Sequence, residues 1–316
     1  MLPPLPGLSD VELAASRIKP YVHQTPVLTS QRLDEHCGAE LFFKCENLQK
    51  VGAFKARGAS NAVLSLSEQD AVHGVATHSS GNHGAALAMA AQRRGIPAHI
   101  VVPANAPEVK LAAIASYNAH IIECGPTLQD RETTLAWVVA QTGAHVVPPY
   151  DDARVIAGQG TVALELLAQA PNLDAVVVPV SGGGLLAGVA TAVKGLSAHI
   201  EVIAAEPTGA DDAFQSFKLG KRLPQPNPQT IADGLRTSLG VLNFAIMREH
   251  VDAVVTVPDE ITVEAMRLQW TRLKTLVEPS GAVSFGALLA HAKRFRGRRV
   301  GVVISGGNVD LDRLPW

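Results

Sequence analysis

The stretch VVVPVSGGGLLAGVATAV, residues 176–193, decides the fold. Its first residues are apolar and mostly β-branched, which is typical of a strand buried on both faces. Ser181 and three glycines follow as a turn, and the Ala-rich segment after them predicts a helix. A buried strand, a glycine turn and a helix in this order indicate an α/β fold with a parallel sheet.

The same order recurs along the chain on both sides of this stretch. Apolar runs predict strands at 40–47, 74–80, 98–104, 120–125, 144–150, 173–180, 200–207 and 298–307. Between them, helices are predicted at 85–95, 109–119, 128–143, 156–170, 185–195 and 261–276. These are too many units for one small sheet, so we expect two α/β domains with a cleft between them.

The composition narrows the class of protein. Apolar residues make up 47% of the 316 residues and charged residues 18%, which suits a packed enzyme-like core. A net charge of −2 without a long basic run argues against nucleic acid or an anionic membrane as a partner. No apolar run is long enough to span a membrane, and no secretory signal pattern is present. Cys37, Cys45 and Cys124 lack CxxC spacing, so we expect packing residues in a cytoplasmic protein.

Three predicted strands end in loops that carry unusual residues. These loops are SSGNHG at 79–84, SGGG at 181–184 and SGGN at 305–308. Ligands of open α/β sheets bind beyond the carboxyl ends of the strands, so we expect the loops to form one site.

Two of these loops allow a functional and a purely structural interpretation. SGGG at a helix start could cradle a phosphate, but glycine is also the ordinary residue of a tight turn. The loop lacks the lysine of a nucleotide P-loop, and no GxGxxG followed by an acid supports a dinucleotide site. SSGNHG could hold a carboxylate or a ring hydroxyl, or could simply cap a helix. His83 in that loop could equally be a packed or solvated histidine.

A single lysine, Lys55, lies in the stretch VGAFKARGA at 51–59. Most lysines are exposed surface residues. Together with a phosphate cradle and a polar loop, however, an amine in this glycine-containing setting suggests pyridoxal 5'-phosphate bound as a Schiff base. A partly desolvated lysine also has a lowered pKa, which helps it act as a base.

Eight segments appear in the order found in fold-type-II pyridoxal-phosphate enzymes, and the chain most resembles the serine racemase and serine/threonine dehydratase family. They are AFKARGA, SSGNHGAALA, IAGQGT, VPVSGGGLLAG, EPTGADDA, IADGLRTSLG, VEPSGAV and SGGNVDL, between about residues 20 and 311. The resemblance implies two open twisted α/β domains, similar to the tryptophan synthase β-subunit, with the active site in the cleft. It implies a large cofactor-binding domain at 1–50 and 150–316, and a small domain at 51–149 that carries SSGNHG.

The resemblance also implies roles for individual residues around the cofactor. Lys55 would form the Schiff base and later move the α-proton of the substrate, and Phe54 would flank the ring. Asn82 would bond the 3-hydroxyl of the ring, and Ser305 would meet the pyridine nitrogen. The phosphate would be held by Gly182, Gly183, Gly184 and the backbone of Leu185.

The substrate side of the implied site lies in the SSGNHG loop. The substrate carboxylate would be gripped by Ser79, Asn82 and His83. Ser80 would stand on the face opposite Lys55 as the second acid–base group of a racemase, or it could be a spectator. Many threonine dehydratases carry alanine at that position.

EPTGADDA at 206–213 resembles the divalent-cation site of the family. Glu206 and Asp212 would supply carboxylates and Ala210 a backbone carbonyl to magnesium or calcium. Without the resemblance, these residues would be interpreted as a solvated acidic turn.

The chain departs from the best-known animal serine racemases at Tyr150, where those enzymes carry asparagine. PYDD looks more like dehydratase-type members, including those that act on 3-hydroxyaspartate. Arg131 and Arg236 could meet a second substrate carboxylate, or could be ordinary surface charges.

We therefore predict a pyridoxal-phosphate dependent dehydratase, also called an ammonia-lyase, that acts on a β-hydroxy amino acid and is a homodimer. The substrate would be serine, threonine or 3-hydroxyaspartate, and the products a 2-oxo acid and ammonia. The alternative is a serine racemase with elimination as a side reaction. A β-replacing synthase is disfavoured by the different asparagine loops of those enzymes, and a non-catalytic ligand-binding protein would have no need of the lysine.

Overall fold

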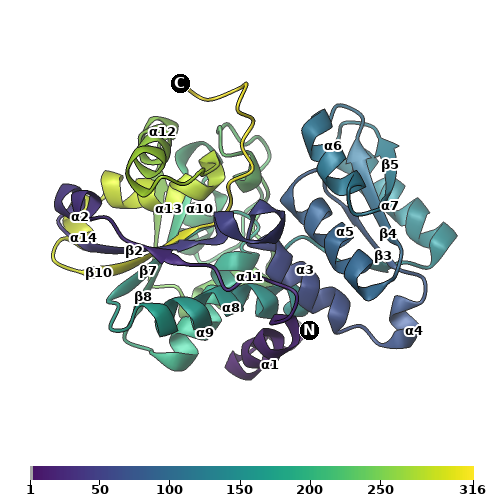
Figure 1. Ribbon diagram of the computed structural model, residues 1–316, viewed down its shortest axis with the longest axis horizontal. Helices are drawn as coiled ribbons and strands as arrows, with labels where there is room; N and C mark the ends of the chain where they lie inside the picture. Colours follow the sequence, from purple (N-terminus) through teal and green to yellow (C-terminus); the bar gives the residue numbers. More distant parts are fainter. Residues whose placement is uncertain (1–2) are drawn as a thin grey trace.

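The computed structural model describes residues 3–316 and contains two β-sheets (Figure 1). The larger sheet has the strand order β1-β2-β10-β7-β8-β9, and the smaller has the order β5-β4-β3-β6. All neighbouring strands are parallel except β1, which runs antiparallel to β2. The predicted α/β class with two twisted parallel sheets is confirmed.

The strands of the larger sheet come from both ends of the sequence, whereas those of the smaller sheet are contiguous. The larger sheet consists of β1 (Val27–Leu28), β2 (Glu40–Cys45), β7 (Ala175–Pro179), β8 (Glu201–Pro207), β9 (Ala253–Val257) and β10 (Arg299–Ile304). The smaller sheet consists of β3 (Val75–His78), β4 (Ala98–Pro103), β5 (His120–Cys124) and β6 (His145–Val146).

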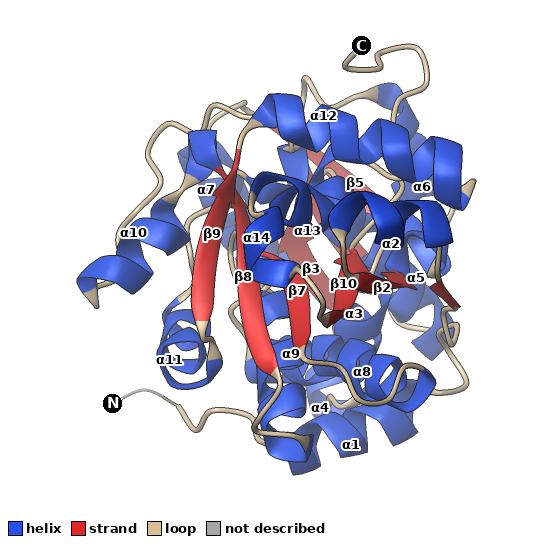
Figure 2. Cartoon of the chain, turned by 90° about the vertical axis from the view of Figure 1, so that its left-hand side faces the viewer, coloured by secondary structure: helices blue, strands red, loops and turns tan. Residues whose placement is uncertain are grey.

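Helices flank the larger sheet on both faces (Figure 2). The α-helices are α1 (Leu8–Ile18), α2 (Gln31–Cys37), α3 (Lys55–Leu64), α4 (Glu68–Ala71), α5 (Asn82–Arg94), α6 (Glu108–Ala115), α7 (Leu128–Thr142), α8 (Ala153–Gln169), α9 (Gly184–Leu196), α10 (Asp212–Leu219), α11 (Val241–His250), α12 (Asp259–Leu268), α13 (Pro279–Ala290) and α14 (Ala292–Phe295). Helix α3 packs against α5 of the smaller sheet and against α8 of the larger one, so it connects the two halves (Figure 1). No helix in residues 3–316 is both long enough and apolar enough to cross a membrane.

Three predicted elements differ clearly in extent from the sequence-based expectation, and one of them is the helix expected at 109–119, which ends at Ala115. The strand expected at 144–150 is only β6, because Pro148 and Pro149 end the pairing soon after it begins. The helix expected at 261–276 is α12 only to Leu268, and it continues as a π-helical turn, Gln269–Leu273. Lys274 then adopts a positive φ of 57°, which ends the helix.

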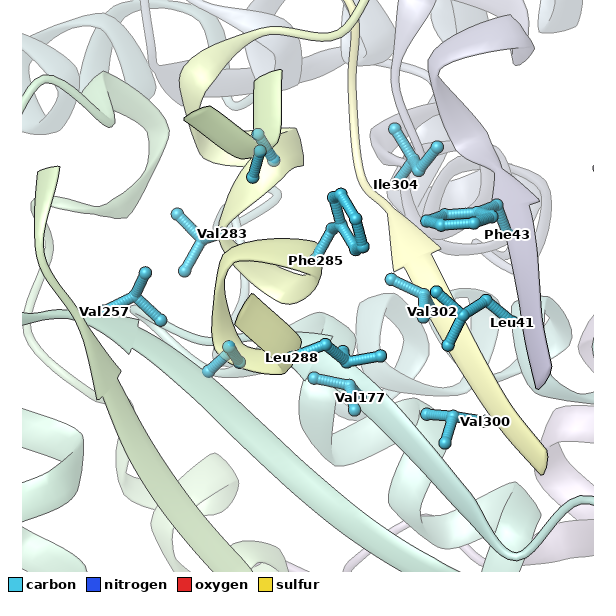
Figure 3. Close-up of a cluster of buried hydrophobic side chains, with 14 of the residues drawn as sticks. Leu41, Phe43, Val177, Val257, Val283, Phe285, Leu288, Val300, Val302 and Ile304 are labelled. Carbon is cyan, nitrogen blue, oxygen red and sulfur yellow. The ribbon is translucent and has the colours of Figure 1, made fainter. Parts of the chain in front are cut away.

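The central strands are apolar at successive positions because both faces of the larger sheet are buried. Val177 and Val302 face α13, where Phe43 and Phe285 pack edge to face with ring centroids 5.3 Å apart (Figure 3). Val176 lies in the core on the opposite face of the sheet. This arrangement explains the continuous apolar run with which the sequence identified the strand.

A cluster of four charged residues lies beneath the start of α3. The guanidinium of Arg57 contacts Glu46 at 2.7 Å and Glu165 at 2.7 Å, and the Lys44 amine contacts Glu165 at 2.6 Å. Lys44, Arg57 and Glu46 are fully buried, and Glu165 has 19% of its side chain exposed. This charge quartet joins β2, α3 and α8, and its two positive and two negative charges balance.

Candidate active site

Lys55 is the first residue of α3, and its amine is buried in the protein interior. Its Nζ donates a hydrogen bond to the carbonyl oxygen of Pro149 at 2.6 Å and lies 5.0 Å from the centroid of the Phe54 ring. Burial lowers the pKa of this amine to about 8. Within residues 3–316 it forms no ion pair, so the neutral, nucleophilic form of this amine is reached at a lower pH than for a surface lysine.

A strained turn precedes this lysine. Val51 has a φ of 56°, in the left-handed region that β-branched residues avoid, and Gly52 follows with a φ of 68°. The turn is tied to the loop after β10: Gly307 N donates to Gly52 O at 2.9 Å, and Phe54 N donates to Ser305 O at 3.1 Å. The SGGN loop and the lysine segment are therefore joined by backbone hydrogen bonds.

The SGGG loop reaches the lysine through its neighbours Pro149 and Tyr150. A Cβ atom built on Gly182 would lie 2.4 Å from the Tyr150 ring, so only glycine allows this contact. Gly183 has a φ of 92° and is followed by the first turn of α9, where the backbone N–H groups lack intrahelical acceptors. The Ser181 hydroxyl is engaged with Thr237, at 2.9 Å from its carbonyl oxygen. The loop has the donor set that an anion needs.

The SSGNHG loop lies between β3 and α5, and its side chains divide into two groups. Ser79, Ser80 and Asn82 are partly exposed, and in residues 3–316 the Ser80 hydroxyl makes no hydrogen bond. His83 has only 2% of its surface exposed, and its Nε2 lies 3.0 Å from Val147 O. Burial, followed by the nearby charge of Lys55, lowers the pKa of His83 to about 3. The imidazole is therefore neutral and offers shape and hydrogen bonding rather than positive charge.

Asn82 connects this loop to the other half of the molecule. Its Nδ2 donates to Glu278 Oε1 at 3.1 Å, and its Oδ1 accepts from Asn308 Nδ2 at 2.9 Å. Ser305 follows β10 with 4% exposure, and its Oγ lies 3.5 Å from Ser280 O. The structure thus brings the three predicted loops and Lys55 together between the two sheets.

The sequence analysis missed one ionisable residue of this site, Glu278. It precedes α13, has 5% exposure, and burial raises its pKa to about 7. The available sign in the sequence was an acidic residue directly before proline at a helix start, in the segment VEPSGAV. Its partners are distant in sequence, so its environment was not apparent.

Glu206 and Asp212 form a second buried acidic group, at α10. Both Glu206 oxygens accept backbone N–H groups, from Ala213 at 2.9 Å and Phe214 at 2.7 Å, and Asp212 Oδ2 accepts from Leu239 N at 2.8 Å. Burial raises the pKa of Asp212 to about 6 and that of Glu206 well above its usual range. Neither forms an ion pair within residues 3–316, and Ala210 beside them is also buried. Among the described residues, no group of three or more His, Cys, Asp or Glu side chains is placed to hold a metal ion, so a cation here would need backbone carbonyl and water ligands besides these two carboxyl groups.

The two candidate arginines bind local backbone. Arg131 Nη2 donates to Pro126 O at 3.1 Å, and Arg236 donates to Thr230 O from Nε at 3.0 Å. Each guanidinium group therefore hydrogen-bonds the backbone of a nearby segment.

Together these features define a class of protein. A buried lysine amine of lowered pKa, a glycine turn at a helix start and polar loops at the carboxyl ends of parallel strands belong to an α/β enzyme that carries an anionic cofactor on an amine. The donor set around Lys55 fits pyridoxal phosphate, since it offers a nucleophile and a separate anion cradle.

Comparison with known proteins agrees with this class. The sequence profile described as pyridoxal-phosphate dependent enzyme matches residues 18–306. The chain is 48% identical to a beta-hydroxyaspartate dehydratase of Paracoccus denitrificans, over 99% of both chains, and 51% identical to a serine racemase of Arabidopsis thaliana, over 96% of this chain and 94% of that one. The structure of maize serine racemase superposes with a TM-score of 0.96 at 46% identity, covering 98% of this chain and 95% of that one. The chain belongs to the family of pyridoxal-phosphate dependent enzymes.

Proposed function

We propose that this enzyme is a dehydratase that converts a β-hydroxy amino acid to a 2-oxo acid and ammonia. The observation that carries the proposal is the Lys55 amine, whose pKa of about 8 allows it to accept a proton near neutral pH. The Paracoccus relative is named a beta-hydroxyaspartate dehydratase, so 3-hydroxyaspartate is the first candidate, ahead of serine and threonine.

Each part of the site has a proposed task. Bound pyridoxal phosphate supplies an electron sink that makes the α-proton of the amino acid acidic. Lys55 Nζ accepts that proton, and Phe54 packs beside the ring. Gly182, Gly183, Gly184 and the backbone of Leu185 hold the phosphate at the start of α9. Asn82 would donate to the 3-oxygen of the ring, and Ser305 would offer a hydroxyl rather than a carboxylate to the pyridine nitrogen.

The substrate is oriented by the start of α5. Ser79 and Asn82 contribute a hydroxyl and an amide to the substrate carboxylate, and neutral His83 supports the loop from beneath. The α-proton and the β-hydroxyl leave together as one water, and hydrolysis then consumes one water, so each amino acid gives one 2-oxo acid and one ammonia.

A second candidate function is serine racemisation. The observation that favours it is the Ser80 side chain, which is partly exposed and free of hydrogen bonds among the described residues. A free hydroxyl on the face opposite Lys55 could return a proton to Cα with inverted configuration. The Arabidopsis and maize relatives are named serine racemases.

Four further features belong to the proposal. Glu206, Asp212 and the Ala210 carbonyl would bind magnesium or calcium. The enzyme would be a cytoplasmic homodimer, with twice the 33.2 kDa chain mass in solution. The larger sheet would belong to a domain of residues 1–50 and 150–316, and the smaller to a domain of residues 51–149.

The deciding experiment is a substrate panel. Both enantiomers of serine and threonine and all stereoisomers of 3-hydroxyaspartate are incubated with the holoenzyme, and 2-oxo acid release and chirality are measured. We expect 2-oxo acid chiefly from 3-hydroxyaspartate, and none from Lys55→Ala. The exposed Lys19→Ala is the matched control and should retain wild-type turnover. If serine is converted to its enantiomer and no 2-oxo acid is released, the dehydratase proposal is wrong and the racemase proposal is supported.

A further inference from the structure

The side-chain amide of Asn82 is held from two sides by residues with fixed hydrogen-bonding roles. Its Nδ2 faces Glu278 Oε1 at 3.1 Å, and its Oδ1 faces Asn308 Nδ2 at 2.9 Å. An asparagine amide keeps its shape when it is rotated by half a turn, so packing alone cannot fix its orientation. The hydrogen-bonding partners must do so.

The partners leave one consistent assignment. Asn308 Nδ2 also lies 2.7 Å from the carbonyl oxygen of Val51, which can only accept, so this atom of Asn308 must be the NH₂ group. The Asn82 atom that faces it is then the oxygen, and the Asn82 NH₂ group faces the carboxylate of Glu278. The same carboxylate accepts from the backbone N–H of Asn308 at 2.9 Å through Oε2.

This network joins segments that are far apart in sequence. Asn82 begins α5 beside the smaller sheet, Glu278 precedes α13, and Asn308 follows β10 of the larger sheet. Two glycines make room for it. A Cβ atom on Gly52 would lie 2.3 Å from Asn308 Oδ1, and one on Gly306 would lie 2.6 Å from Glu278 Oε1.

We infer that Glu278 and Asn308 are positioning residues that fix the Asn82 amide with its NH₂ group toward Glu278, which leaves one N–H of that group to donate to the coenzyme. Asn82 Nδ2 lies 3.1 Å from Oε1 and 3.4 Å from Oε2 of Glu278, which we assign to one hydrogen shared between both carboxylate oxygens, so the second Nδ2 hydrogen remains available. This inference rests on the proposed function, in which Asn82 donates to the 3-oxygen of pyridoxal phosphate. In this assignment Glu278 acts only through Asn82 and has no direct contact with the coenzyme.

Isosteric variants separate this role from mere support of the fold. In Glu278→Gln, the new NH₂ group must face either the Asn308 backbone N–H or the Asn82 NH₂, so one donor loses its acceptor. In Asn308→Asp, a carboxylate oxygen replaces the NH₂ group that faces Val51 O and Asn82 Oδ1. Each change keeps the side-chain volume while it removes the polarity that orients the amide.

The test is a double-mutant cycle on the holoenzyme, with Asn82→Ala, Glu278→Gln and the pair. The readouts are the dissociation constant of pyridoxal phosphate and the visible absorption maximum of the bound coenzyme. We expect Glu278→Gln to weaken coenzyme binding by about tenfold, the size of one lost charge-assisted hydrogen bond, and to shift the absorption band. In the Asn82→Ala background the same substitution should change neither readout.

Several outcomes would overturn the inference. Effects of Glu278→Gln that persist in full in the Asn82→Ala background would show that Glu278 acts independently. Unchanged coenzyme binding and spectrum in Asn82→Ala would show that there is no contact to position. If Glu278→Gln does not fold, the cycle is run with Asn308→Asp, for which the same non-additivity is expected and additivity overturns the inference. Failure of the proposed dehydratase is seen separately, in the substrate panel, and leaves these coenzyme readouts intact.

Discussion

At the scale of single residues, the amine of Lys55 is unusual because a carbonyl oxygen, rather than a carboxylate, is its hydrogen-bonding partner. Pro149 O accepts from Nζ without stabilising the charged form as an anion would, and burial then lowers the pKa to about 8. A surface lysine would remain protonated up to a pH of about 10.4.

The lowered pKa of Lys55 predicts how covalent binding of the coenzyme depends on pH. Only the neutral amine attacks an aldehyde, so the rate at which apoprotein binds pyridoxal phosphate covalently should rise with pH and level off above about 8. The rate is followed by absorbance after mixing at a series of pH values. A rate that keeps rising toward pH 10 would show an ordinary lysine.

Some of the candidate site residues could be identified from the sequence, and others could not. Asn82 and the glycines of SGGG were singled out because they lie in short motifs after predicted strands, and Lys55 because of its glycine-containing segment and the family resemblance. Glu278 was missed because its burial depends on Asn82, which is 196 residues away in sequence, and on the loop after β10. Likewise, nothing local indicates that His83 is neutral, since its low pKa comes from burial in the folded chain.

At the scale of elements, α3 and α8 cross with almost no space between their backbones. A Cβ atom on Gly158 of α8 would lie 2.6 Å from the Cα of Gly58 and 2.8 Å from the carbonyl oxygen of Arg57 in α3. The close crossing fixes the start of α3, and therefore Lys55, relative to the larger sheet. Sequence periodicity predicted α8 but not α3, which is short and whose exposed face is small.

Gly158→Ala should therefore push the two helices apart. We expect a loss of about 1–3 kcal/mol in the free energy of unfolding, the usual cost of overpacking, together with weaker coenzyme binding. Urea unfolding and coenzyme titration measure the two effects. Gly7→Ala is the control for added volume, because the nearest atom to its added Cβ is 4.0 Å away; Gly7 is the N-cap of α1, so a loss of less than about 1 kcal/mol is expected there, with coenzyme binding unchanged.

At the scale of the whole molecule, the alternation of strands and helices predicted the two-sheet architecture, while pairing order and several elements did not follow from it. Strand β9 was missed because AVVTV is only five residues long and follows directly after α11, a helix that the sequence analysis did not predict either. The position of β2 beside β10 joins segments more than 250 residues apart, which no local pattern encodes. The domain boundaries remain predictions.

If the cation site proposed at Glu206 of β8 and Asp212 of α10 is correct, stability should depend jointly on pH and on a cation. Because folding raises the pKa of Asp212 to about 6, its contribution to stability is present below its unfolded pKa and is lost as pH rises through 6. A cation bound at the proposed site would offset this loss, so magnesium or calcium should raise Tm little at pH 5 and clearly at pH 7.5. At about 100 times its Kd, a cation adds about 2.7 kcal/mol.

Thermal unfolding with cation or with EDTA measures this effect, and Asp212→Asn should abolish most of it. Equal stabilisation at both pH values, or no effect of cation on the native protein, would contradict the proposed site.

The charge quartet of Lys44, Glu46, Arg57 and Glu165 restricts the routes by which this sequence can diverge. Substitution of any one member leaves an unpaired charge in the interior and should lower the free energy of unfolding by about 3–5 kcal/mol. Replacement of all four by apolar residues need not destabilise the protein. Single substitutions at these four positions should therefore destabilise the protein. We expect related sequences either to keep all four residues or to replace all four together.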